Sequence, residues 1–176
     1  MQPSLAGLIP ITSEPISTTS NDTFKAWYAV TRPVIARALA VTLGDAELAG
    51  EAADEAMARA YQSWAKIEHT DNRDGWAYRV ALNWALSVFR RRRPVTRVHH
   101  VIASELPLPV DDSVRRALQS LDINQRTVVV CRYLLGWSEQ QTADALQIRP
   151  GTVKSRLSRA TVLLRDQLAH LLPESS

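Results

Sequence analysis

The sequence has 176 residues, which is enough for one ordinary domain or two small ones. Hydrophobic residues make up 45% of it, which excludes a disordered chain, and its single cysteine excludes a disulfide framework and a cysteine-based zinc site. The net charge of +3 is unevenly placed: residues 149–165 hold five basic side chains and no acid, residues 90–93 are four arginines, and residues 45–55 hold five acids and no base.

Long segments with a helical period, and only six glycines, predict an all-α protein. No run of about 18 apolar residues occurs, so we expect no membrane span and a cytoplasmic location. Residues 1–21 are rich in Pro, Ser and Thr and are predicted to be a disordered tail. We expect a small helical domain over 22–93, a flexible linker over 94–111 and a second small helical domain over 112–172.

The first domain is predicted to contain three helices. An amphipathic helix covers residues 22–43, and Pro33 within it is expected to kink or split it. A second helix over 45–66 opens with an aspartate that can cap it. A polar loop over 68–74 then leads into a third helix over 75–92, which runs out into the arginine cluster.

The second domain is predicted to contain four helices, of which the last two form a helix-turn-helix. Asp122 with Gln125, and Ser138 with Gln141, are capping boxes that open its second and third helices. The turn before the last helix places Gln147 where many such units have glycine. A left-handed backbone at a non-glycine residue costs about 1–2 kcal/mol.

The last helix is predicted to start at Pro150 and to be amphipathic. At about 100° per residue, Ser155, Ser158 and Arg159 lie opposite its apolar stripe, with Lys154 and Arg156 on the flanks. Such a helix fits the major groove of DNA, although a solvated basic face is the simpler alternative for one basic helix alone. The apolar stripe consists of Val153, Leu157, Ala160, Leu164 and Leu168.

The third helix of the first domain carries a second nucleic-acid signal. Aromatic side chains interleaved with arginines suit single-stranded bases, which stack on the rings while the arginines neutralise the backbone. For Trp76 and Trp84, which share a face, we favour a place in the core. Residues 90–93 are expected to contact phosphate. The aromatic and basic residues concerned are Trp76, Tyr78, Trp84, Phe89, Arg73, Arg79 and the arginines at 90–93.

No catalytic arrangement is evident in the sequence. The four histidines have no metal-ligand spacing, and there is no glycine-rich phosphate loop or nucleophile elbow, so we expect no metal, no cofactor and no enzymatic activity. Glu51, Asp54 and Glu55 fall at helical spacing on an exposed side of the second helix, and composition alone favours a solvated face for them.

Several stretches in both parts of the chain resemble a known family. Residues 151–160, GTVKSRLSRA, are similar to the signature of region 4 in bacterial extracytoplasmic-function (ECF) sigma factors, and RTVVVCRYLLGWSEQQTADAL upstream resembles earlier helices of that region. Residues 44–61 and WAYRVALN at 76–83, with the arginine run, resemble region 2. The resemblance covers about residues 22–93 and 112–170, with the most specific motifs in region 4.

The resemblance implies a subunit that binds the β′ clamp helices and β flap of core RNA polymerase and directs it to promoters, with an anti-sigma factor as a further partner. Region 4 would read the −35 element and region 2 would melt and capture the −10 element. A compact state would hide both DNA surfaces. The implied −35 contacts are Thr152, Lys154, Ser155, Arg156 and Arg159; the implied −10 contacts are Asn72, Arg73, Arg79, Asn83, Arg90 and Arg91; the implied polymerase contacts are Glu51, Asp54 and Glu55.

Four positions depart from the family pattern. Asp54 stands where Gln is common, Leu82 where Arg is common, Ser87 where Asp is common, and Asp122 where Pro is frequent. The competing hypothesis is a free-standing helix-turn-helix regulator whose first domain senses a ligand or partner. The acidic helix followed by an aromatic and arginine-rich helix favours the sigma factor.

Overall fold

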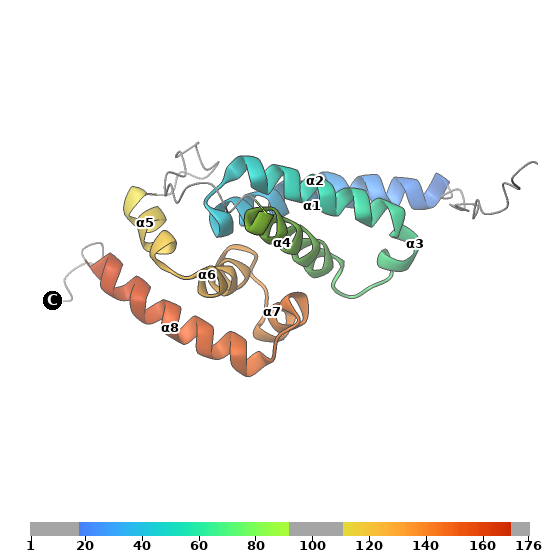
Figure 1. The fold of residues 1–176 in the computed structure, drawn as a ribbon. Coiled ribbons are helices and arrows are strands. Elements are labelled where there is room, and N and C mark those ends of the chain that lie inside the picture. The colour runs from blue at the N-terminus through green and yellow to red at the C-terminus, as the bar shows by residue number, and fades with distance from the viewer. Residues whose placement is uncertain (1–17, 92–110, 170–176) are drawn as a thin grey trace, which may run out of the picture.

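The computed structural model describes residues 18–91 and 111–169, and every regular element in these ranges is a helix. Residues 1–17 of the predicted tail, residues 94–110 of the predicted linker and the residues after 169 lie outside the described residues. Helices α1 to α4 form the first half of the molecule, and α5 to α8 with the π-helix η1 form the second half (Figure 1). None of the described helices is long and apolar enough to cross a membrane. The all-α fold is therefore confirmed.

The first half is a bundle of three long helices and one short one. Helix α1 (Thr18–Leu43) runs unbroken through Pro33, so the predicted split is wrong, and it begins four residues before the expected start. Helix α2 (Ala46–Gln62) is capped by the carboxylate of Asp45, which accepts the N–H of Leu48 at 2.9 Å. Gly44 ends α1 with φ +71°, a conformation that glycine adopts without strain.

The predicted second helix is interrupted at Ser63. Helix α2 ends there, and the four-residue α3 (Trp64–Ile67) follows. The break turns Trp64 into the core, where its side chain is 1% exposed. Helix α4 (Arg73–Arg91) starts two residues earlier than predicted and packs against α1 and α2.

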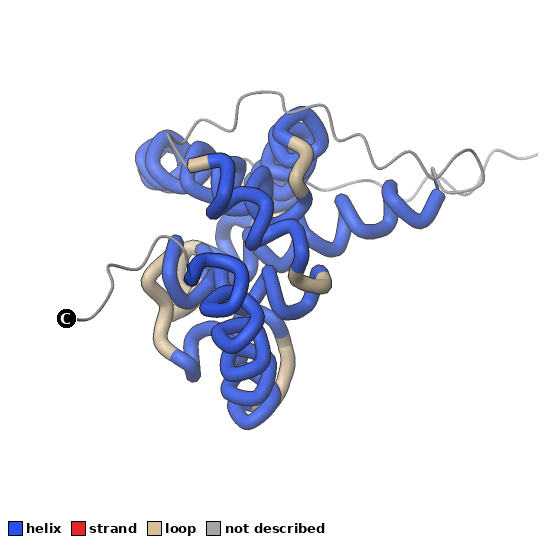
Figure 2. The backbone as a smooth tube through the Cα atoms, turned by 90° about the vertical axis from the view of Figure 1, so that its left-hand side faces the viewer, coloured by secondary structure: helices blue, strands red, loops and turns tan. Residues whose placement is uncertain are grey.

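In the second half, the short helices α6 and α7 lie beneath the first half, and the long helix α8 lies on the outside (Figures 1 and 2). Helix α5 (Asp112–Ser120) and helix α6 (Ile123–Val129) precede η1 (Val130–Leu134), a π-helical turn where the sequence pattern had predicted continuous α-helix. Helix α7 (Glu139–Leu146) and helix α8 (Pro150–Leu168) complete the half. Both predicted capping boxes, at Asp122 and Ser138, are present.

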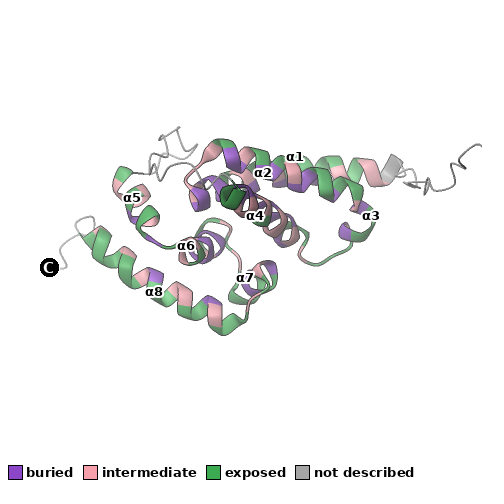
Figure 3. Cartoon of the chain, in the orientation of Figure 1, coloured by how far each residue is buried: buried purple, intermediate pink, exposed green. Residues whose placement is uncertain are grey.

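Burial differs between the two halves (Figure 3). The largest core cluster belongs mainly to α1, α2 and α4, but it also contains Val130 and Cys131 of η1. The second half has two small clusters of its own, one centred on Leu121 and Ala160 and the other on Val128 and Val153. Cys131 is completely buried, whereas Tyr61 of α2 is 43% exposed.

Gln147 has φ +55°, so the turn holds this non-glycine residue in the left-handed conformation. Its side-chain amide donates to the carbonyl of Asp144 at 3.1 Å, and the N–H of Ile148 bonds the carbonyl of Ala143. We expect Gln147→Gly to raise the free energy of unfolding by up to about 1 kcal/mol, because glycine removes the left-handed strain at the cost of one exposed hydrogen bond. Urea denaturation of the full chain measures it, and a loss of stability would show that the amide contact outweighs the strain.

Candidate nucleic-acid and polymerase interfaces

The helix-turn-helix is held rigidly by its own caps and core. The hydroxyl of Ser138 accepts the N–H of Gln141 at 3.0 Å, and the side chain of Gln141 accepts the N–H of Ser138 at 2.8 Å. Ala143 is 1% exposed where α7 meets α8, and Val153 of α8 is completely buried. Because both ends of α7 and the inner face of α8 are fixed, the outer face of α8 has a defined orientation.

The outer face of α8 is basic and open to solvent. Lys154, Ser155 and Arg159 are exposed, while Thr152 and Arg156 are half-buried at its edge. Among the described residues, no ion pair engages Lys154, Arg156 or Arg159. The structure therefore places all five predicted −35 residues on the solvent-facing side of α8. Four residues of the predicted apolar stripe pack beneath it: Val153, Leu157, Ala160 and Leu164.

The predicted −10 residues lie along one side of α4. At 100° per residue, Arg79, Asn83 and Arg90 share a narrow strip of the helix surface, with Arg73 and Arg91 beside it. Asn83, Arg90 and Arg91 are exposed, and Arg79 is half-buried. The two tryptophans of this helix are half-buried at the edge of the core, in partial agreement with the place we favoured for them.

Asn72 differs from the other −10 candidates because it caps α4. Its Oδ1 accepts the N–H of Gly75 at 2.9 Å, and a side chain at Gly75 would collide with it. Its Nδ2 donates to the main-chain carbonyl of Gln141 in the second half at 3.4 Å. Asparagine is a preferred N-cap, so its place before Arg73 was a signal for this role that the sequence interpretation missed.

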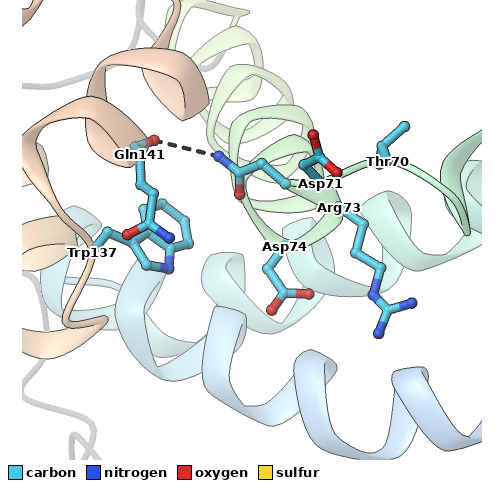
Figure 4. A pocket seen from close by; sticks show the side chains of 7 residues that line it. Thr70, Asp71, Arg73, Asp74, Trp137 and Gln141 are labelled. Carbon is cyan, nitrogen blue, oxygen red and sulfur yellow. Dashed lines mark hydrogen bonds between the residues drawn. The ribbon is translucent and has the colours of Figure 1, made fainter.

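Asp74 joins the start of α4 to α1. Its Oδ1 accepts the indole N–H of Trp27 at 2.6 Å and the hydroxyl of Thr31 at 3.3 Å. The loop before α4 is thus anchored on one side by α1, and it faces the second half on the other. Figure 4 shows Trp137 and Gln141 opposite the loop residues. The pocket between them has a volume of about 370 Å³ and is lined by Thr70, Asp71, Asn72, Arg73, Asp74, Trp137 and Gln141.

The acids of α2 share a surface, but two of them already have arginine partners. Asp54 forms a bidentate ion pair with Arg32, in which Nε donates to Oδ1 and Nη2 donates to Oδ2, both at 2.9 Å. This hydrogen-bonded pair raises the pKa of Arg32. Glu55 pairs with Arg59 at 2.8 Å. Exposed pairs of this kind are worth at most about 1 kcal/mol, so a cationic partner could exchange for either arginine. Sequence patterns do not reveal such pairing between helices.

Across residues 18–91 and 111–169, no group of three or more His, Cys, Asp or Glu side chains is placed to hold a metal ion. The buried ionisable groups lie between the halves. Burial raises the pKa of Cys131 to about 12 and that of Tyr78 well above its ordinary value. Neither group is charged near neutral pH, which suits their places in a packed core.

The sequence is similar to those of known proteins. Residues 111–173 match the family model described as sigma-70, region 4. The chain is 35% identical to the RNA polymerase sigma-E factor of Streptomyces coelicolor over 123 residues, covering 64% of this chain and 67% of that protein. It is 30% identical over 136 residues to the ECF RNA polymerase sigma factor SigM of Mycobacterium tuberculosis, covering 74% of this chain and 69% of that one.

A solved structure has a similar fold. The sigma factor RpoE of Bartonella quintana, in complex with the anti-sigma factor NepR, superimposes with a TM-score of 0.69 at 21% identity, covering 83% of this chain and 96% of that chain. The region 4 match and these relatives together define the class, the sigma factors of the sigma-70 type. Within that class, the chain belongs to the extracytoplasmic-function sigma factors. It is accordingly a transcription initiation factor.

Proposed function

We propose that the second half binds the −35 element of promoters through the outer face of α8. The observation that carries this proposal is the exposed basic surface of α8, whose cations have no acidic partner among the described residues. Lys154, Ser155, Arg156 and Arg159 are placed to reach base edges in the major groove. Thr152, in the first turn, would hold a phosphate at the positive end of the helix.

The first half, in this proposal, captures the −10 element as a single strand. Asn83 and Arg79 would contact bases from the polar side of α4, while Arg90 and Arg91 hold phosphate. Arg73, the first residue of α4, would reach the same strand, and its guanidinium also donates to the carbonyl of Glu68 at 3.5 Å. Asn72 would join them only if it leaves Gln141.

Core RNA polymerase is the proposed protein partner. The acidic side of α2, with Glu51, Asp54 and Glu55, suits a basic surface such as the β′ clamp helices, and the second half would bind the β flap. The chain would act in the cytoplasm and carry out no chemistry of its own. An anti-sigma factor is a further proposed partner, supported by the structural neighbour, which was solved with one.

The experiment is promoter selection from a random duplex pool by reconstituted holoenzyme, followed by base-by-base binding measurements on the selected promoter. Arg159→Ala should cost on the order of 1–3 kcal/mol and relax the preference at one −35 position, because its guanidinium pairs with a base edge. Arg156→Ala should behave likewise. Arg165→Ala, on an exposed part of α8 beyond the proposed contacts, is the matched control. Equal weakening on every sequence would instead make Arg159 a phosphate contact.

A further inference from the structure

One side of helix α1 carries four hydrogen-bonding side chains at successive spacings of three, four and four residues. At about 100° per residue, they fall within a strip about 80° wide on the helix surface. All four lie within hydrogen-bond distance of a carboxylate at one end or the other of the α3–α4 loop, residues 68–72. We call this set the polar strip of α1, and it consists of Ser20, Thr23, Trp27 and Thr31.

The polar strip holds the end of the loop through Asp74, in the first turn of α4. Its Oδ1 accepts the indole N–H of Trp27 at 2.6 Å and the hydroxyl of Thr31 at 3.3 Å. The two donors are only 6% and 5% exposed. The indole of Trp27 also packs on the ring of Trp64, with centroids 5.0 Å apart. Because Trp27 cannot move without repacking the core, Asp74 is tied to a rigid group.

The same helix holds the start of the loop through Glu68. Its Oε2 lies 3.2 Å from the hydroxyl of Thr23 and 3.4 Å from that of Ser20. The side chain of Glu68 is only 18% exposed. The Thr23 hydroxyl also accepts the indole N–H of Trp64 at 3.0 Å, which fixes its position. At roughly 1.5 Å per residue, the attachment points for Glu68 and Asp74 lie about 11 Å apart along α1.

Contact with DNA does not explain these two carboxylates. A carboxylate repels the phosphates of a strand, so each of them lowers the affinity of a loop that binds DNA. Their bonded oxygens are turned toward α1, whereas the proposed strand contacts next to them are an amide and a guanidinium. Asn72 is bonded to the N–H of Gly75, and Arg73 to the carbonyl of Glu68. The places of Asn72 and Arg73 therefore follow those of the two acids.

We propose that Glu68 and Asp74 are positioning residues for the −10 strand: the polar strip of α1 holds both ends of the loop and so fixes the geometry in which Asn72 and Arg73 meet the bases. This inference rests on the proposed function. A loop held at both ends loses less conformational freedom when a strand binds, and it presents its donors in one arrangement. That arrangement favours the matching sequence over others.

The experiment measures binding of a fluorescein-labelled −10 non-template strand to holoenzyme reconstituted with the full chain. The strand comes from a promoter that the wild-type holoenzyme selects, and a scrambled strand of the same composition is the reference. Asp74→Ala removes the acceptor of Trp27 and Thr31, so the ratio of the two affinities should fall about tenfold. Asp74→Asn keeps an acceptor oxygen and removes only the charge, so the ratio should stay within about twofold of the wild type.

Trp27→Phe removes the same hydrogen bond from the α1 side and leaves an aromatic ring in the core. It should lower the ratio as well, and combining it with Asp74→Ala should add little, because both remove one interaction. Asp22→Ala is the control for net charge, since it removes an exposed acid of α1 that pairs with Lys25 at 3.5 Å. It should leave the ratio unchanged. Cooperative melting and unchanged affinity for −35 duplex show that each variant is folded.

The outcomes distinguish this inference from the proposed function. A wild-type ratio in Asp74→Ala would overturn the inference and leave strand capture standing. An equal fall of the ratio in Asp74→Ala and Asp74→Asn would mean that the strand depends on the charge of Asp74, which also overturns a positioning role. A wild-type holoenzyme that binds both strands equally well would overturn the −10 assignment itself, and the inference with it.

Discussion

Trp64→Ala is expected to lower the free energy of unfolding by about 3–5 kcal/mol. The indole is 1% exposed and lies 5.2 Å from the ring of Phe24 and 5.0 Å from that of Trp27, measured between centroids. Its N–H donates to the hydroxyl of Thr23 at 3.0 Å. Truncation leaves a cavity between α1 and α3 and one hydroxyl without its donor. Total stabilities of about 5–15 kcal/mol make this a large fraction of the whole.

Urea denaturation of the full chain measures the effect of Trp64→Ala, and Tyr61→Ala is the matched control. Tyr61 also contacts Phe24, at 5.0 Å between ring centroids, but it is 43% exposed, so its loss should cost about 1.5 kcal/mol or less. A loss of unfolding free energy below about 1 kcal/mol in Trp64→Ala would contradict the role of Trp64 as the residue that packs α3 against α1.

The double variant Asp54→Arg with Glu55→Arg is expected to abolish binding to core RNA polymerase. Two acids become two cations on the surface proposed to meet a basic partner, and like charges placed across an interface cost several kcal/mol. Surface plasmon resonance with immobilised core polymerase measures the loss. Melting temperatures should change little, because both positions lie on the outer side of α2 and their arginine pairs are exposed.

Arg32→Gln tests whether the double variant loses binding because the Asp54 carboxylate is gone or because its ion pair with Arg32 is broken. It breaks the ion pair with Asp54 at 2.9 Å but leaves the carboxylate in place. If Asp54 binds polymerase, releasing it from Arg32 should keep or strengthen the complex. Loss of binding in Arg32→Gln as well would instead mean that the pair acts by positioning α2 against α1, or that Arg32 is itself a contact.

Sequence patterns predicted those features that depend on neighbours within a few residues. The capping box at Ser138 and the polar face of α8 both follow from spacing along one helix. The break at Ser63 was missed because both flanking segments have good helical periodicity. The π-turn at η1 was missed for a similar reason, since its bonds differ from those of an α-helix by only one residue.

Contacts between distant segments were beyond the sequence for a physical reason. An arginine at a helix surface has the same local pattern whether it faces solvent, as Arg159 does, or pairs across helices, as Arg32 does with Asp54. Arg126 donates to the carbonyl of Thr42, which lies 84 residues away in the other half of the molecule. Position along the helix therefore predicted which residues lie on the solvent-facing side of α8 but could not show that Asn72 is engaged by the second half.

Co-elution of the wild-type chain with purified core RNA polymerase on gel filtration tests the central claim most directly. A sigma factor is predicted to elute with the polymerase and to support a transcript from a selected promoter that core polymerase alone does not make. If the chain instead elutes separately while still binding duplex DNA through α8, the proposed polymerase surface on α2 would be wrong, and the chain would act as a free-standing helix-turn-helix regulator.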